Sequence, residues 1–259
     1  MTERGRLLRP LRPDEFQKLA DAIDETPETV IPIHLLRRGT CRVYSDGEPS
    51  PLVAVVVQSE SLRGEALRRF GLGSDSLGLW DLLRRIDDWE RVDVSPTVAP
   101  RLGALIREST GERVCYYDDV YHILRRPAPV LSDPAVRELT LDDLGLLDAA
   151  GVEGDSFGDL SVLLTEGVVA AAVISGKIVA TAQTGALTER YADIGVQTDA
   201  EWRRRGFATV MASIVARRVQ KAGRIPVWSC GEDNMASLRV AEKLGFQEVS
   251  RLTYVIKGS

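Results

Sequence analysis

The chain has 259 residues, of which 44% are hydrophobic and 27% are charged, a composition typical of a soluble globular protein. Its formal net charge of −5 gives no general reason to expect nucleic-acid binding. No segment approaches the ~20 apolar residues that span a membrane, and the first residues lack the apolar core of a signal peptide. We therefore expect a cytoplasmic protein with neither nucleic acid nor membrane as a partner.

The cysteines and histidines show no metal-binding pattern. Cys41, Cys115 and Cys230 are far apart and form no Cys-x-x-Cys pair, which argues against a disulfide framework and against a zinc site. His34 and His122 have no partner at the spacing of metal ligands, so we expect packed or surface histidines rather than catalytic ones. No metal cofactor is expected.

The first 126 residues alternate between helical and strand patterns. Residues 14–24 predict a helix whose apolar face contains Phe16, Leu19, Ala20 and Ile23. The other elements expected in this half are a weaker apolar stretch at 29–38 broken by Pro32, strands at 41–44 and 52–57 around an Asp46-Gly47 turn, a helix at 75–86 with Leu77, Trp80 and Leu83 facing inward and Leu82 as a further candidate, a strand at 91–94, a helix at 98–108 and a strand at 114–124.

Residues 127–134 predict a linker, because three prolines in eight residues prevent a regular element. We therefore expect one domain at 1–126 and a second at 135–259. In the second domain we expect a mobile, Gly- and Asp-rich loop at 151–160. The elements expected around it are strands at 136–139, 168–174, 177–184, 193–198, 226–230 and 246–256 and helices at 141–150, 161–164 and 235–244.

The stretch from Asp193 to Gly223 combines a strand, a basic turn and an amphipathic helix. Residues 193–198 alternate as a half-buried strand does, and from Arg203 onward apolar residues recur at helical spacing as far as Gly223, which is placed to end the helix. The turn, Arg203-Arg-Arg-Gly-Phe-Ala208, brings unpaired N–H groups, the positive end of the helix dipole and two very small side chains together. This predicts a pyrophosphate site. The alternative is a solvated helix start with surface arginines.

Residues 193–209 and the later run Asn234-Met-Ala-Ser-Leu-Arg-Val-Ala-Glu-Lys-Leu-Gly-Phe246 together resemble the two acyl-CoA-binding motifs of the GNAT N-acetyltransferase superfamily. The resemblance covers residues 134–256 and implies an α/β (α+β) fold with a mixed, mostly antiparallel central sheet flanked by helices. It also implies acetyl-CoA as the co-substrate, held by Val196, Thr198, Arg203, Arg204, Arg205, Gly206, Phe207, Ala208, Thr209, Asn234 and Ser237. Asn234 is in addition a good N-cap for the helix that it starts, and the two roles are compatible.

The resemblance places a catalytic base at Asp193, near the start of the strand that leads to the turn. A carboxylate in a cleft can accept a proton from an amine if burial raises its pKa. The alternative is a solvent-facing strand residue, and Glu189 is a second choice for the base.

The sequence departs from the family at the general acid. Many GNAT enzymes have a tyrosine four residues before the Gly of the second motif, and this chain has Ala241 there. Tyr254 on the final strand is our candidate acid, with Ser237 and Cys230 as substitutes. The alternative for Tyr254 is a packed strand aromatic, and some family members work without a dedicated acid.

The first half repeats the order of the second. Residues 89–121 parallel residues 224–255, and Arg68-Arg-Phe-Gly-Leu-Gly73 resembles the turn Arg203–Ala208, which suggests two tandem GNAT-like domains. Residues 61–69 lack a strand pattern, and Ala99 stands where Asn234 would have its counterpart. We therefore expect a degenerate first domain that binds no CoA and that builds an interface or covers the substrate.

These features predict an acetyl-CoA-dependent N-acyltransferase, an enzyme that transfers groups other than aminoacyl groups, acting on a primary amine of a small molecule or peptide. The alternative is a non-catalytic acyl-CoA-binding regulatory module. A nucleotide-hydrolysing phosphate loop is excluded because no Gly-Lys-Ser/Thr follows the turn. The identity of the amine and the oligomeric state stay open, with a homodimer as one option.

Overall fold

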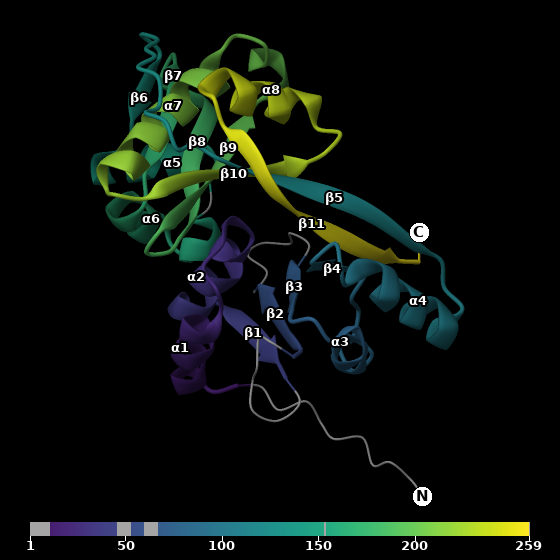
Figure 1. The fold of residues 1–259 in the computed structure, drawn as a ribbon. Coiled ribbons are helices and arrows are strands. Elements are labelled where there is room, and N and C mark those ends of the chain that lie inside the picture. Colours follow the sequence, from purple (N-terminus) through teal and green to yellow (C-terminus); the bar gives the residue numbers. More distant parts are fainter. Residues whose placement is uncertain (1–10, 46–52, 60–66, 153, 259) are drawn as a thin grey trace, which may run out of the picture. The chain divides into compact units, whose positions relative to one another are not determined.

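The computed structural model describes residues 11–45, 53–59, 67–152 and 154–258. Within these residues the chain forms two compact units (Figure 1). The first unit takes in the described residues of the ranges Met1–Asp24, Leu35–Asp119 and Arg251–Ser259, and the second takes in those of Glu25–His34 and Val120–Ser250. The compact units therefore interleave along the chain, and the predicted division into domains at 1–126 and 135–259 with a linker at 127–134 stays a prediction.

The first unit has strands in the order β1-β2-β3-β4-β11-β5. Strands β3 and β4 pair in parallel. The pairs β1/β2, β2/β3 and β4/β11 are antiparallel. Its elements are α1 (Pro13–Ala22), part of α2 (Val30–Arg38), β1 (Cys41–Tyr44), β2 (Val55–Ser59), β3 (Arg69–Leu72), α3 (Ser76–Leu83), β4 (Arg91–Val94), α4 (Ala99–Thr110), the start of β5 (Val114–Ile123) and the end of β11 (Gln247–Lys257).

The second unit has strands in the order β5-β10-β9-β8-β7-β6. Here β9 and β10 are parallel, and β6/β7, β7/β8 and β8/β9 are antiparallel. Its further elements are β6 (Val136–Glu138), α5 (Leu144–Ala149), α6 (Leu160–Glu166), β7 (Val169–Ile174), β8 (Lys177–Leu187), β9 (Tyr191–Thr198), α7 (Phe207–Lys221), β10 (Ile225–Gly231), α8 (Met235–Leu244) and four 3₁₀ turns, η1 (Pro27–Thr29), η2 (Leu141–Asp143), η3 (Asp155–Phe157) and η4 (Ala200–Trp202). The mixed, mostly antiparallel sheet flanked by helices is confirmed.

Helix α7 packs against the sheet and contributes several residues to the hydrophobic core of the second unit. Its apolar side contacts a sheet face that is unusually rich in alanine, which lets the helix backbone approach the strands closely. The helix contributes Phe207, Met211, Ala212, Val215, Ala216 and Val219, and the strands contribute Ala170, Ala172, Ala180, Ala182 and Ala192. Burial of each Val or Met side chain stabilises the fold by ~1.5–3 kcal/mol. This packing fixes the direction of α7 and therefore the position of its first turn.

The repeated order of elements is present in the structure. The series β3, α3, β4, α4, β5 matches the series β9, α7, β10, α8, β11, and each series contains one parallel strand pair. The last strand of each series extends into the other compact unit: Thr253 of β11 pairs with Val94 of β4, and the Leu124 N–H after β5 donates to the Pro226 carbonyl of β10 at 3.1 Å. Each unit is thus completed by a strand from the other repeat.

Three expectations for the first half need correction. Residues 30–38 form helix α2 despite Pro32, because Pro32 lies in the first turn, where an N–H has no helical acceptor. In α3, Trp80, Leu82 and Leu83 are buried, but Leu77, in the first turn, is 57% exposed and Leu79 is buried instead. Residues 69–72 are a strand rather than a turn. The Asp46-Gly47 turn lies outside the described residues.

The second half differs from expectation mainly at strand and helix ends. Helix α7 begins at Phe207 and not at Arg203, because Arg204 and Gly206 have positive φ angles of 65° and 90°. Strand β8 continues to Leu187 and β9 begins at Tyr191, so both strands extend beyond the expected ranges of 177–184 and 193–198. None of the described helices combines the length and the apolar character needed to cross a membrane.

Candidate functional site

The turn between β9 and α7 exposes backbone N–H groups. The first helical hydrogen bonds run from the N–H groups of Thr209 and Val210 to the Gly206 carbonyl, at 3.0 and 3.2 Å. The N–H groups of Phe207 and Ala208 therefore precede the first bonded turn, where helical N–H groups lack acceptors and the dipole is positive. A Cβ placed on Gly206 would have no atom within 4 Å, so the space beside the turn is open. This end of α7 is suited to an anion.

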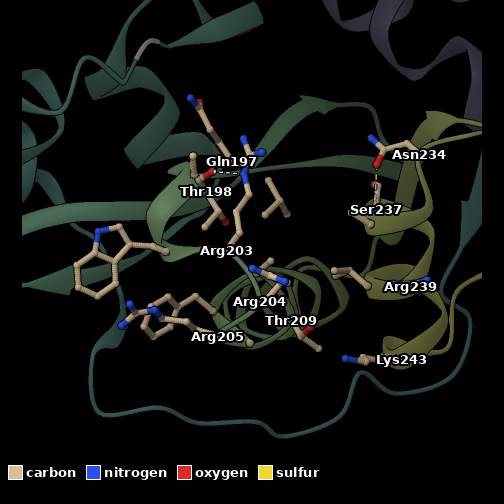
Figure 2. Close-up of a pocket in the computed structure, with 18 of the residues that line it drawn as sticks. Gln197, Thr198, Arg203, Arg204, Arg205, Thr209, Asn234, Ser237, Arg239 and Lys243 are labelled. Carbon is tan, nitrogen blue, oxygen red and sulfur yellow. Dashed lines mark hydrogen bonds between the residues drawn. The ribbon is translucent and has the colours of Figure 1, made fainter.

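A cavity of about 880 Å³ opens at this turn (Figure 2). Its wall is built from the end of β9, the turn, the first turn of α7, β10 and one face of α8. The structure places all eleven residues predicted to hold the cofactor along this one cavity: Val196, Thr198, Arg203, Arg204, Arg205, Gly206, Phe207, Ala208, Thr209, Asn234 and Ser237. Two segments separated by the whole of α7 and β10 therefore form a single site.

The cavity also has lining residues that the sequence interpretation missed. They are Gln197, Ala200, Trp202, Trp228, Ala236, Arg239, Val240 and Lys243. Those on α8 were detectable, because Ala236, Arg239, Val240 and Lys243 follow one another at i, i+3, i+4 and i+7 and must share a helix face. Trp228 had no such signal, because its position depends on how β10 lies against α8.

The basic turn is held in place by two contacts. The Arg203 side chain donates from Nε to the Thr198 carbonyl at 3.2 Å, which links the turn to the end of β9. The Arg205 guanidinium lies 4.3 Å from the centre of the Trp202 ring, a distance typical of a cation–π contact. These contacts order two of the three arginines before any ligand is bound.

The opposite wall is ordered by the start of α8. The Asn234 side chain accepts a hydrogen bond from the Ser237 N–H at 3.1 Å, so Asn234 is the N-cap of α8, as its alternative role required. The Trp228 indole donates to the Ser237 hydroxyl at 2.9 Å. Ser237 thus joins β10 to α8, and its hydroxyl already accepts one hydrogen bond.

The charge of the cavity is opposite to that of the chain. Its charged lining residues are Arg203, Arg204, Arg205, Arg239 and Lys243, and no Asp or Glu of the described residues is among them. The whole chain has a formal net charge of −5. Such a local concentration of cations attracts and holds an anionic ligand. The arrangement suits a ligand with several phosphate groups.

Asp193 lies on β9, three residues before the first cavity residue of that strand, Val196. Its side chain is 9% exposed, so the alternative of a solvent-facing strand residue is wrong. The Ser229 hydroxyl of β10 lies 3.5 Å from Asp193 Oδ1. Asp193 itself does not line the cavity. Glu189, the second choice for the base, is exposed in the turn between β8 and β9.

An irregularity in β8 makes room for the Asp193 carboxylate. The register between β8 and β9 shifts between Thr184 and Ala186, which leaves Gly185 as an extra residue opposite Asp193. A Cβ on Gly185 would lie 2.9 Å from Asp193 Oδ2. The Ser156 hydroxyl of η3 donates to the Gly185 carbonyl, so the loop that we expected to be mobile is tied to this bulge.

Tyr254, the predicted acid, belongs to the first compact unit and does not line the cavity. Its hydroxyl donates to the Asp119 carboxylate, and the Arg68 guanidinium lies 3.4 Å from the same hydroxyl. Burial, reinforced by Asp93 and Asp119, raises the pKa of Tyr254 well above its usual value. These contacts match the alternative interpretation of Tyr254, a packed aromatic residue of the final strand. Ala241, at the place of the family tyrosine, is buried.

Comparison with known families and structures identifies the fold. Residues 148–255 match the family model of GNAT acetyltransferases. The chain is similar to a GCN5-related N-acetyltransferase-like protein from Streptococcus suis, with 20% identity and a TM-score of 0.67 over 94% of this chain and 98% of the other. A GCN5-related N-acetyltransferase from Sphaerobacter thermophilus gives 18% identity and a TM-score of 0.58 over 96% and 94% of the two chains.

A third similar structure has a repeated architecture. It is a tandem GNAT protein from the clavulanic acid biosynthesis pathway, with 12% identity and a TM-score of 0.56 over 96% of this chain and 98% of the other. No curated protein matches the chain. Because all three identities are low, these similarities establish the fold and leave the reaction to be argued from the site.

Proposed function

We propose that this chain, whose residues 148–255 match the family model of GNAT acetyltransferases, is an acetyl-CoA-dependent N-acyltransferase acting on a primary amine. The observation that carries the proposal is the cavity at the start of α7. It combines unpaired backbone N–H groups with five cationic side chains and no acidic one among the described residues. A small anion alone would not need a cavity of this size, whereas a nucleotide-linked thioester would.

The residues of this chain have separable roles in holding acetyl-CoA. The N–H groups at Phe207 and Ala208, with the neighbouring arginines, would bind the pyrophosphate. The backbone near Val196 and Thr198, beyond the part of β9 that pairs with β10, would bind the pantetheine arm. When bound, acetyl-CoA supplies a thioester carbonyl that a neutral amine can attack. The cavity lining fits this group, because its small residues lie at the turn and its cations lie around it.

Asp193 is our candidate for the base that takes the proton from the attacking amine. It is buried, it lies on the same strand as the cavity residues Val196 and Thr198, and the bulge at Gly185 gives its carboxylate a defined place. Acceptance of the amine proton by Asp193 would leave the amine lone pair free to form the new C–N bond as the C–S bond breaks. The acceptor is a small molecule or peptide amine in this proposal.

In this proposal no protein side chain protonates the leaving thiolate. Tyr254 was the candidate, but its hydroxyl is engaged by Asp119 in the first unit. We therefore propose release of the CoA thiolate to solvent, which is chemically tolerable for this leaving group. The second candidate function is a non-catalytic acyl-CoA-binding module. The missing tyrosine at Ala241 is the observation that favours it.

An assay of acetyl transfer to a panel of amines, read as release of free CoA thiol, tests the proposal. We expect activity in the wild type and a loss of about 10²–10⁴-fold in Asp193→Asn, with the affinity for CoA unchanged. Binding of CoA without transfer to any amine would favour the non-catalytic module. Failure of the wild type to bind CoA would exclude both functions.

We also propose that each chain binds one CoA, because the first unit is built differently at the equivalent helix. The start of α3 is capped by its own carboxylate, since Asp75 accepts a hydrogen bond from the Leu77 N–H at 3.0 Å. An anion there would meet a negative charge instead of free N–H groups. In addition, the Arg68 guanidinium forms an ion pair with the buried Asp93 at 2.9 Å and is not available to a phosphate. Calorimetric titration of the full chain should give one site, and two equivalent sites would refute this expectation.

A further inference from the structure

Two cations of the cavity stand apart from the basic turn. Arg239 and Lys243 lie one turn apart on α8, and both line the cavity. Both are exposed, and within the described part of the chain neither side chain has a hydrogen bond or an ion pair. Figure 2 shows them on the α8 wall, with the Lys243 side chain directed toward Thr209 of α7.

The charges of this pair do not favour the helix. Like charges at i and i+4 on a helix repel each other. Neither residue compensates that repulsion with a protein acid, since no described Asp or Glu lines the cavity. By contrast, the turn arginines Arg203 and Arg205 have contacts within the protein. The α8 pair is therefore placed for a charge that the ligand supplies.

The ligand of the proposed function has two separate anionic groups. The pyrophosphate is accounted for by the N–H groups of the α7 turn and the arginines beside it. The remaining group is the phosphate on the 3′-oxygen of the ribose. Ala208, Thr209 and Ala236, which line the cavity near the starts of the two helices, have small side chains, and no described Asp or Glu lines the cavity, so a phosphate between these helices meets no acidic residue.

We infer that Arg239 and Lys243 bind the 3′-phosphate and make this site select CoA thioesters over thioesters that lack this phosphate. Guanidinium and ammonium groups bind phosphate oxygens through charge-assisted hydrogen bonds, which are stronger than neutral ones. The inference rests on the proposed function, because it assigns a part of the same ligand. It adds a specificity that the turn alone cannot supply, since the turn contacts a group that CoA and dephospho-CoA share.

Calorimetric titration with CoA and with dephospho-CoA tests the inference. The variants are Arg239→Gln, Lys243→Gln and the double variant. The matched control is Arg217→Gln with Lys221→Gln, which also removes two cations at i and i+4, from a part of α7 that lines a different hollow. We expect the wild type to prefer CoA by about tenfold or more, because only CoA has the phosphate that would accept charge-assisted hydrogen bonds from this pair.

The double variant should lose this preference, binding CoA at least about tenfold more weakly and dephospho-CoA within about twofold of the wild type. Retained dephospho-CoA binding would also show that the variant is folded. Equal losses for the two ligands would assign the α8 cations to the pyrophosphate and overturn the inference. Equal binding of the two ligands by the wild type would overturn it as well, with the proposed function intact. A wild type that binds neither ligand would overturn the proposed function and this inference with it.

Discussion

The carboxylate of Asp193 occupies the place where a side chain of Gly185 would be. A Cβ on Gly185 would approach Asp193 Oδ2 to 2.9 Å, and its three nearest atoms would all belong to Asp193. Gly185 is the extra residue of an irregularity in β8, and the hydroxyl of Ser156 binds its carbonyl. The absence of a side chain at this position therefore determines where the proposed catalytic base lies.

Substitution Gly185→Ala should displace the Asp193 carboxylate without unfolding the protein. The clash is with the end of a movable side chain and not with backbone, so the cost in stability should be small. We expect the rate of acetyl transfer to fall at least about tenfold, because a general base must lie within hydrogen-bond reach of its proton. The KM for acetyl-CoA should stay unchanged, since Asp193 does not line the cavity.

The control for this experiment is Gly145→Ala, in α5. A methyl group there would have no atom within 4 Å, and alanine favours a helix. It should leave the turnover unchanged. A Gly185→Ala variant with wild-type turnover would show that the position of Asp193 does not matter to the reaction.

Substitution Gly206→Glu should abolish CoA binding. Gly206 is the N-cap of α7 at φ 90°, and the space beside it is open, so a glutamate would place a negative charge where we expect the pyrophosphate. Gly206→Ala is the matched control, because it imposes the same unfavourable φ at a cost of ~1 kcal/mol without adding charge. Calorimetry should show binding by the alanine variant and none by the glutamate variant. Equal affinities in the two folded variants would contradict the assignment.

Substitution Tyr254→Phe should lower stability and leave catalysis nearly unchanged. It removes the hydroxyl that donates to Asp119 in a buried network that also contains Arg68 and Asp93. We expect the free energy of unfolding to fall by ~1–3 kcal/mol in urea titrations. Tyr116→Phe is the control, since Tyr116 is 44% exposed, and its effect should stay within ~0.5 kcal/mol. A fall in turnover of about 10²–10⁴-fold would instead identify Tyr254 as the general acid.

The ion pair of Asp143 with Arg137 should make stability depend on pH in the acid range. Hydrogen bonds from Arg137, at 2.6 and 2.9 Å, lower the pKa of Asp143 from 3.8 to about 2, with a further contribution from the Thr140 N–H. Because this pKa is lower in the folded state, the stabilisation is complete above the unfolded value of 3.8 and is lost as the pH falls toward about 2. The difference in unfolding free energy between wild type and Asp143→Asn should therefore shrink over that interval.

A direct measurement of the same pair is an NMR titration of the Asp143 carboxyl carbon. Arg137→Gln should raise the pKa of Asp143 toward 3.8, because it removes the largest cause of the shift. A wild-type pKa already near 3.8 would show that the ion pair is not formed in solution.

Local patterns of the sequence were sufficient for most of the cavity. The turn at 203–208, the periodicity of α7 and the cap at Asn234 each depend on residues within a few positions of one another, so backbone geometry and helical spacing predict them directly. The same logic failed in the first turn of α3, where Leu77 is exposed and Leu79 is buried. It also failed for Pro32, whose effect depends on its place within the helix.

Contacts between distant segments required the tertiary structure. Strands β4 and β11 pair although most of the chain separates them in sequence. No local pattern favours β11 over β5 as the neighbour of β4. The bulge at Gly185, the tie from Ser156 and the burial of Asp193 arise only when β8, β9 and η3 come together. Side-chain periodicity tells which face of a strand is apolar but not which strand lies beside it, because register and neighbours are set by packing over the whole unit.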